Sequence, residues 1–355
     1  MPKCCRRKEE EIQTTKHRTM RESRKQFFII FFPLLLKGVS TFQCSREDKT
    51  IRWTLFSQNN FPDEETSLRI LRETQFTSLP RLYVGPLPTY QSLSTIPLSV
   101  GTKISLSPSQ AHYVTKVMRI GGKQQRSNKN LLRIFDGTHG EWLAEIIVAD
   151  ANDRMRKRQA DPSVSAHCLQ RLRPQPASHL EPWLYLAPLK KNRIKMILEK
   201  CTELGVGGFT IIATDRTDPG SERDCQDVEK LAIQIIEACE QCERLNIPTL
   251  LPLDDEITVK KLLDKYKDSA HNLLICRERS NASPVLNVLE RLGEQNSKIS
   301  FLVGPEGGWS QEEENTFDSY SSKLICGVSL GSSVLRAETA AMTAVAAYTL
   351  VRDSN

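Results

Sequence analysis

Short apolar runs alternate with longer amphipathic segments over the C-terminal half of the chain. The runs are short enough to be buried strands, and the segments between them repeat apolar residues at a spacing close to 3.6, which is typical of helices. The expected strands are residues 183–188, 209–214, 272–278, 299–304 and 324–331, and the expected helices are residues 193–206, 225–245, 284–293 and 338–351. This alternation predicts an α/β domain over residues 180–355 with a mainly parallel sheet.

The pattern before this domain is different, because short β-type stretches follow one another between turn residues. The expected strands are residues 103–107, 130–137, 141–149 and 164–172. One helix is expected over residues 108–120, capped by Ser107 or Ser109. Its apolar positions at helical spacing are Tyr113, Val114, Val117 and Met118. Residues 80–175 are therefore predicted to form a small β-barrel with one helix.

The first 79 residues show no comparable pattern. Basic residues precede a ten-residue apolar run at 27–36, and small residues follow it at 38–41, which is the layout of a signal peptide. The run is too short to span a membrane. We expect a mostly disordered targeting leader over residues 1–79. Its signal-then-Phe42 order resembles plastid leaders, and the acids at 9–11 and 63–65 argue against a mitochondrial one. An unstructured tail without targeting function is the alternative.

Charge is unevenly distributed along the chain. The net charge is +6 overall, but residues 81–193 carry 17 basic and 7 acidic residues, and residues 194–355 carry 17 basic and 26 acidic ones. A basic module followed by an acidic one predicts a polyanion-binding surface on the first, with scattered solvated charges as the alternative. The candidate RNA contacts in the basic stretch are Arg81, His112, Lys116, Arg119, Lys190 and Arg193.

The ten cysteines do not indicate a metal site. Cys239 and Cys242 form a lone C-x-x-C in a helical segment, and no second pair or histidine lies at zinc spacing. We interpret the cysteines as small thiols in a reducing compartment.

Two loops in the acidic domain carry the candidate chemistry. Gly304, Gly307 and Gly308 follow a buried strand, and Ser332 to Arg336 follow the next one. Ligands in open α/β sheets bind beyond the carboxyl ends of strands, where both loops would lie. The first loop is neither a dinucleotide nor a triphosphate motif. Ser310 is expected to cap a helix with three glutamates in its first turn, which would repel a phosphate. The loops therefore predict a cofactor pocket for a ligand other than a nucleotide phosphate.

Six segments resemble one known family in sequence and in order. They are HYVTKVMRIGG, LRIFDGTHGEWLAEI, APLKKNRIKMILEKCTELGV, AIQIIEACEQCERLNIP, FLVGPEGGWSQEE and SLGSSVLRAETA. From Arg81 to its end the chain resembles the RsmE-type 16S ribosomal RNA (uridine-N3) methyltransferases of the SPOUT class. It departs from the family in a polar insert at 121–130 and a longer segment at 150–163.

The resemblance implies a PUA-like RNA-binding β-barrel over residues 80–175 and an α/β SPOUT methyltransferase domain with a deep trefoil knot over residues 180–355. It implies a homodimer that uses S-adenosyl-L-methionine to methylate N3 of a uridine in small-subunit ribosomal RNA, free or in the assembled subunit. No metal and no membrane partner is expected. The bacterial relatives are cytoplasmic, whereas the leader of this chain favours an organelle, plastid over mitochondrion.

Site residues carry over from the family motif to matching positions of this sequence. The implied cofactor contacts are Leu302, Gly304, Glu306, Gly307, Leu330, Gly331, Leu335 and Ala337. Arg336 and Glu338 are the implied catalytic residues. A cation at Arg336 would stabilise the uracil anion, and Glu338 would orient that cation or accept the N3 proton.

Three alternatives stay open. Arg336 and Glu338 could pair only to brace the helix start, the substrate could be another RNA, and the chain could be a non-catalytic RNA-binding assembly factor on the same fold.

Overall fold

A computed structural model gives the structure of the protein and describes residues 42–47, 50–55, 76–89, 96–120, 130–148, 164–177, 181–267, 269–278, 281–293 and 298–353. The chain divides into two compact units, residues 1–71 and 72–355. In the first unit, strands β1 (Phe42–Glu47) and β2 (Thr50–Leu55) pair antiparallel. Residues 1–41 and 56–75 of the predicted leader lie outside the described residues, as do most of the segments 121–130 and 150–163. Among the residues that are described, no helix is long and apolar enough to cross a membrane.

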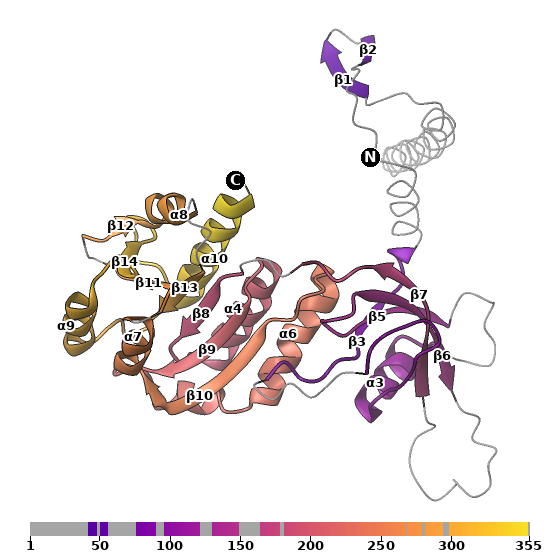
Figure 1. Cartoon of the computed structure of the whole chain (residues 1–355), viewed down its shortest axis with the longest axis horizontal. Helices are drawn as coiled ribbons and strands as arrows, with labels where there is room; N and C mark the ends of the chain where they lie inside the picture. The colour runs from indigo at the N-terminus through magenta and orange to yellow at the C-terminus, as the bar shows by residue number, and fades with distance from the viewer. Residues whose placement is uncertain are drawn as a thin grey trace, which may run out of the picture. The chain divides into compact units, whose positions relative to one another are not determined.

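The second unit begins with a five-stranded sheet. Its strands run in the order β3 (Arg81–Tyr83), β5 (Leu131–Phe135), β6 (Glu141–Val148), β7 (Val164–Arg173) and β4 (Lys103–Ser105). Figure 1 labels four of them, β3, β5, β6 and β7, beside helix α3. The β3–β5 pair is parallel and the other pairs are antiparallel. Four of these strands lie within or at the predicted segments, and the sheet packs one face on a core with Val114, Leu132 and Ile146.

The predicted helix at 108–120 is shorter and changes character. Helix α3 (Pro108–His112) starts with a capping box in which the Ser107 hydroxyl accepts from the Gln110 amide. A π-helical turn, η1 (Tyr113–Val117), follows it. On this segment Ala111, Val114 and Met118 face the core, whereas Tyr113 and Val117 are exposed. The predicted apolar face is therefore corrected at Tyr113 and Val117.

The C-terminal part is a sheet of seven parallel strands, in the order β10-β9-β8-β13-β11-β14-β12. The strands are β8 (Trp183–Leu186), β9 (Gly208–Ala213), β10 (Thr249–Thr258), β11 (Asn272–Cys276), β12 (Ser283–Pro284), β13 (Ile299–Val303) and β14 (Ile325–Ser329). The expected α/β domain with a parallel sheet is confirmed.

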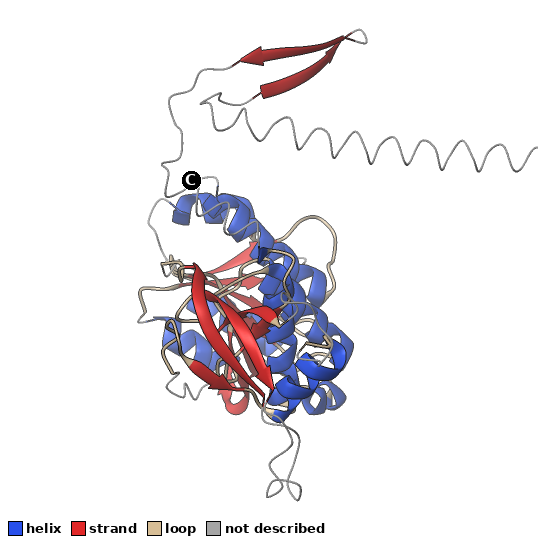
Figure 2. Ribbon diagram, turned by 90° about the vertical axis from the view of Figure 1, so that its right-hand side faces the viewer, coloured by secondary structure: helices blue, strands red, loops and turns tan. Residues whose placement is uncertain are grey.

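Helices cover both faces of this sheet, seen as blue ribbons beside the red strands in Figure 2. The helices are α4 (Lys191–Glu203), α5 (Pro219–Asp224), α6 (Val228–Cys242), α7 (Val259–Lys267), α8 (Val285–Gly293), α9 (Gln311–Tyr320) and α10 (Ala337–Asp353). Residues of α4, α6, α8 and α10 share the larger core with the sheet, and residues of α7 and α9 share the core on the other face.

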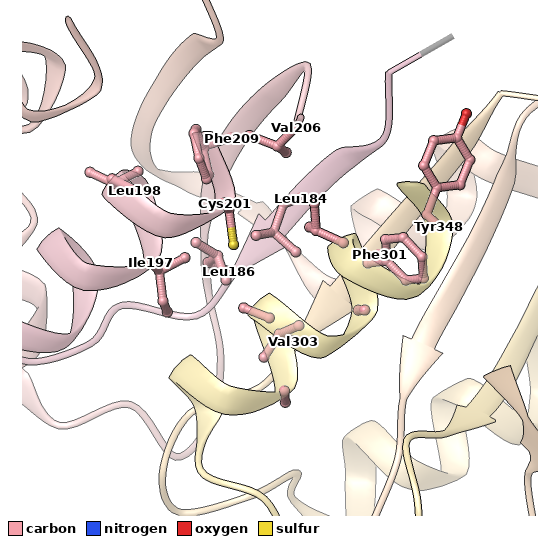
Figure 3. Close-up of a cluster of buried hydrophobic side chains, with 14 of the residues drawn as sticks. Leu184, Leu186, Ile197, Leu198, Cys201, Val206, Phe209, Phe301, Val303 and Tyr348 are labelled. Atoms are coloured by element: carbon pink, nitrogen blue, oxygen red, sulfur yellow. The ribbon is translucent and has the colours of Figure 1, made fainter. Parts of the chain in front are cut away.

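Alternation along the central strands separates these two cores. In β13, Phe301 and Val303 belong to the larger core, and Leu302 between them belongs to the core under α7 and α9. Figure 3 shows the larger core, where Phe301 lies beside Tyr348 of α10 and Leu186 of β8 lies near Ile197 of α4. Because both faces are covered, the strands are continuous apolar runs, which is why the sequence pattern located them well.

A charged joint connects the first sheet to helix α6. Arg81 is 5% exposed, and its Nε donates to Glu141 Oε1 at 2.6 Å. Its Nη1 donates to the carbonyl of Cys239 at 2.5 Å. Arg133 Nη2 donates to Glu243 Oε1 at 2.8 Å and Arg173 Nε to Glu141 Oε2 at 2.7 Å. Arg81 was an expected RNA contact, and the structure corrects this. Its guanidinium is buried, and it bonds to Glu141 within the first sheet and to the backbone carbonyl of Cys239 in α6.

Candidate functional site

The two loops singled out in the sequence meet at the carboxyl edge of the parallel sheet. They follow the strands β13 and β14, which lie on either side of β11. Together with residues 276–278 after β11, they enclose a cavity of about 530 Å³. This size lies within the range of small-molecule sites. We refer to it as the carboxyl-edge cavity.

The first loop is shaped by a close approach and a turn. Gly304 lies under the indole of Trp309, and a Cβ there would be 2.9 Å from Trp309 Cε2. Gly308 has φ of +67°, which favours glycine, and its amide donates to the Pro305 carbonyl at 3.0 Å. Trp309 Nε1 in turn donates to the Cys276 carbonyl at 3.2 Å. The loop is therefore fixed against the end of β11 with its backbone lining the cavity.

The second loop leads into the last helix. Gly331 has φ of +137° and its amide donates to Ser329 Oγ at 3.3 Å. Ala337 is buried at the start of α10, and the Arg336 carbonyl accepts from the Ala340 amide at 2.8 Å. All of the predicted cofactor contacts except Leu302 line the cavity. Leu302 does not line the cavity, because its side chain is buried in the core under α7 and α9.

The glutamates in the first turn of α9 make different contacts. Ser310 caps the helix: its hydroxyl accepts from the Glu313 amide, and Glu313 Oε2 accepts from the Ser310 amide at 2.8 Å. Glu313 is 5% exposed and also accepts from the Asp215 amide, and burial raises its pKa. Glu314 pairs with Arg277, which lies over the Phe317 ring and also holds Asp318 at 2.7 Å. The expected cap at Ser310 is confirmed.

The two predicted catalytic residues differ in environment. Arg336 is exposed at the cavity wall. The Glu338 side chain is 12% exposed, and its Oε2 is a buried atom without a hydrogen-bond partner. Its nearest cation is Arg193, whose Nη1 lies 3.9 Å from Glu338 Oε2 and 3.0 Å from Glu306 Oε1. Among the ion pairs of the described residues, Glu338 pairs with Arg193 and not with Arg336, so the bracing alternative has no geometric support here.

The remaining candidate RNA contacts lie in different places. His112 and Lys116 are exposed on α3 and η1, and Arg119 is exposed just beyond them with φ of +57°. Lys190 is exposed at the N-cap of α4. Arg193 lines the carboxyl-edge cavity, so the structure brings it to the two predicted catalytic residues.

Three cavity residues were not expected from the sequence. Trp309, Arg277 and Arg216 all line it, and Arg216 Nη1 donates to the Gly307 carbonyl at 3.2 Å. Trp309 directly follows the glycine loop, Arg277 directly follows β11 and Arg216 lies three residues after β9, so proximity to a strand end was an available signal for all three.

The described part of the chain offers no cluster of side chains for binding a metal ion. Within it, no group of three or more His, Cys, Asp or Glu is placed to hold a metal ion. Cys239 is buried, and burial raises its pKa to about 12, so it stays a thiol.

Comparison with known proteins gives a consistent set of likenesses. Residues 176–349 match the model of a family described as an RNA methyltransferase domain. The chain is 31% identical over 261 residues to Ribosomal RNA small subunit methyltransferase E of Rickettsia conorii, covering 72% of this chain and 92% of that protein. It is 28% identical to the protein of the same name from Synechocystis, covering 71% of this chain and 74% of that protein.

Solved structures resemble the same region. One is a ribosomal RNA small subunit methyltransferase E from Neisseria gonorrhoeae bound to S-adenosyl methionine, with TM-score 0.56 and 25% identity, covering 77% of this chain and 97% of that one. A methyltransferase from Legionella pneumophila has TM-score 0.57 at 24% identity and covers 78% of this chain and 98% of that one, which shows a shared fold.

Proposed function

The chain belongs to the ribosomal RNA small subunit methyltransferase E family, and on that premise we propose that it methylates N3 of a uridine in small-subunit ribosomal RNA. Its cofactor is S-adenosylmethionine. The observation that carries the proposal is the carboxyl-edge cavity, which both family loops line together with Arg336 and with Arg193, the cation 3.9 Å from Glu338.

The cavity fits this cofactor. Its volume of about 530 Å³ suits a ligand of that size, and nothing lies within 4 Å of a Cβ built at Gly308 or Gly331, so the backbone there is open to a ligand. The buried, unpartnered oxygen of Glu338 indicates a polar partner from outside the chain. Gly304, Gly307, Gly331 and Leu335 would hold the cofactor through their backbone, with Glu306 beside them.

The chemistry at N3 requires loss of a proton and formation of one bond. When bound, S-adenosylmethionine supplies an electrophilic methyl group, whose bond to sulfur breaks with the electron pair staying on sulfur. Uracil N3 must lose its proton before it can attack. The exposed guanidinium of Arg336 is placed to stabilise the resulting anion, and Glu338 to accept the proton or to orient the base. N3 lies on the pairing edge, so the target uridine must be unpaired or flipped out.

The finer architecture is part of the same proposal. A PUA-like barrel is supported by the contact between strand β3 of the five-stranded sheet and helix α3. There Gln110 Nε2 donates to the Tyr83 carbonyl at 2.8 Å. A trefoil knot is supported by the path after β14, because α10 packs against α4 and β13 on the far side of β11. We also propose a homodimer, which light scattering of the full chain would report as twice 40.3 kDa.

We propose further that residues 1–79 direct the protein to a plastid. The support is the order of basic, apolar and small residues in the sequence. A fluorescent protein fused after residue 79 should collect in the organelle, and the same fusion without residues 1–79 should not. Equal distribution of the two fusions would overturn the targeting role.

The test of the activity uses the purified full chain with methyl-labelled cofactor and small ribosomal subunits that lack the modification. After digestion, the label is expected in 3-methyluridine. Label in another nucleoside would replace the substrate assignment. Cofactor binding by calorimetry without any transfer to RNA would favour the non-catalytic assembly factor.

A further inference from the structure

A second cavity lies at the opposite, amino edge of the same sheet. It has a volume of about 650 Å³ and is bounded by the first residues of β8, β9 and β13 together with β10 and α7, all labelled in Figure 1. Ile299 and Ser300 of β13 line it, whereas Val303 of the same strand lines the carboxyl-edge cavity. At about 3.3 Å per strand residue, the two cavities are separated by roughly 13 Å of strand. We refer to this second one as the amino-edge pocket.

The wall of the amino-edge pocket is aromatic and apolar. Trp183 is half-buried, and its Nε1 donates to Thr210 Oγ1 at 2.8 Å, which fixes the plane of the indole. Tyr185 and Tyr266 are buried beside it with rings edge to face, and the Tyr266 hydroxyl donates to Ser300 Oγ at 2.6 Å. Burial raises the pKa of both phenols, so both stay neutral. A fixed indole face with neutral hydroxyls nearby is suited to stacking and hydrogen bonding of a planar polar ring.

The rim of the pocket is basic although the domain around it is acidic. Lys261, Lys265 and Lys298 are exposed on it, and so is His271. The one acid among the described lining residues is Glu181, which is already paired with Arg244 at 2.7 Å and accepts from Asn246. The three lysines come from two separate segments that converge on one opening, and their charge is not neutralised by the lining. A surface of this kind attracts an anion.

We propose that the amino-edge pocket binds an unpaired nucleotide of the RNA, with its base against Trp183 and the flanking phosphates at Lys261, Lys265 and Lys298. Aromatic faces combined with lysines that track a phosphate backbone are the physical basis of single-strand binding. The proposal rests on the proposed function insofar as it takes RNA as the substrate. It gives the acidic domain an RNA contact of its own, away from the methyl-transfer site.

Helix α7 offers a matched control for the test. Lys260 and Lys267 are exposed on the same helix and do not line the pocket. We compare K261E/K265E with K260E/K267E, which have the same change of charge. The probe is a fluorescein-labelled single-stranded RNA decamer of mixed sequence, and its anisotropy is followed at several salt concentrations without cofactor.

K261E/K265E is expected to bind the decamer at least about tenfold more weakly than the wild type. Its slope of log K against log salt should be smaller by about 1.4, the value for two lost phosphate contacts on a single strand. K260E/K267E should keep both values near those of the wild type. Equal losses in the two double variants would overturn the pocket and leave only a general charge effect.

Quenching of tryptophan fluorescence tests whether a base stacks on Trp183. RNA is expected to quench tryptophan emission of the wild type by stacking on Trp183, and W183F should keep its affinity while losing that quenching. Quenching that persists in W183F would overturn the stacking contact.

The failures of this proposal and of the proposed function are distinguishable. If small subunits are methylated by both double variants with equal KM and the decamer binds both equally, the pocket fails and the methyltransferase stands. If the wild type transfers no methyl group but K261E/K265E alone loses the decamer, the pocket stands and the proposed activity fails.

Discussion

Arg336 and Glu338 lie two residues apart and yet occupy opposite environments. Arg336 is exposed in the loop before α10, and Glu338 is largely buried inside the helix's first turn near Arg193. In the proposed reaction the exposed cation would contact the base, whereas the carboxylate is largely enclosed near Arg193. This division suits a reaction in which one group stabilises a developing anion and another controls its proton.

Replacing Arg336 should therefore affect chemistry and not cofactor binding. R336A is expected to lower kcat for methyl transfer at least about 100-fold, which is typical of removing one electrostatic stabiliser. Its cofactor affinity by calorimetry should be unchanged within about twofold. R336K keeps the charge and should recover part of the rate. Turnover of R336A at the wild-type level would refute the role.

Arg193 has two possible roles that a salt titration separates. As a cavity residue it holds Glu306 and Glu338, whereas as an RNA contact it would neutralise a phosphate. R193M is expected to lower kcat about tenfold or more, because Glu306 and Glu338 lose their shared cation, and to leave the salt dependence of RNA binding unchanged. K190M, at an exposed neighbouring position, serves as the comparison. A smaller salt slope in R193M with an unchanged kcat would restore the RNA-contact role.

Residues with local signals were predictable and residues with distant partners were not. Gly304 and Gly331 follow buried strands, so their place at the sheet edge followed from the sequence. Arg81 lies in a basic stretch, and nothing next to it in the sequence indicates that Glu141 and the end of α6 bury it. A charge count cannot separate a paired arginine from an exposed one, because pairing depends on residues 60 or more positions away.

At the scale of elements, five of the seven strands of the parallel sheet were found, because they are apolar runs between two covered faces, and the two-residue strand β12 was not. Strand β10 was missed, since its segment TLLPLDDEIT is short of apolar residues and contains Pro252. Helix α7 was missed with it, although it places four buried residues in the core. The π-helical turn η1 was not predicted either. Helices are identified in a sequence by a period of 3.6 residues, and this period does not distinguish a single π-helical turn from an α-helix.

The cap of α9 gives a prediction at this scale. Ser310 satisfies the Glu313 amide at the start of the helix that follows the glycine loop. S310A is expected to lower the free energy of unfolding by about 1 kcal/mol, the usual cost of losing such a cap. Urea unfolding followed by circular dichroism measures it. S319A, near the other end of α9, should change it by less than about 0.5 kcal/mol, and an equal loss in both variants would count against the cap.

At the scale of the whole unit, the joint between the two sheets depends on buried charges. Within the first sheet, Glu141 is 1% exposed and accepts from both Arg81 and Arg173. The same two arginines donate across the joint to the carbonyls of Cys239 and Glu243, so separating the two parts would leave buried charged groups without these partners. The same joint contains Glu240 of α6, whose Oε1 accepts from the Tyr83 amide at 2.8 Å. Burial raises the pKa of Glu240 to about 7, against the opposing effects of the Tyr83 amide and Arg81.

The raised pKa of Glu240 makes the stability of the joint dependent on pH. A carboxyl with a folded pKa of about 7 and an unfolded pKa of about 4.3 keeps its proton more firmly when folded. Its contribution is thus fully present below the unfolded pKa and is lost as pH rises to about 7. E240Q stays neutral and its amide oxygen can still accept from Tyr83. It should be more stable than the wild type at pH 8, by at most roughly 4 kcal/mol, and nearly equal to it at pH 4.5.

Urea unfolding at several pH values between 4.5 and 8 measures this difference. The control is E229Q, an exposed position near the start of the same helix that is not among the charges acting on Glu240, and it should follow the wild type within about 0.5 kcal/mol. E240Q and the wild type share all other titrating groups. The difference between their free energies of unfolding therefore reports the contribution of Glu240 alone. A difference that does not grow with pH would show that Glu240 is charged in the folded protein and that Arg81 compensates for its burial.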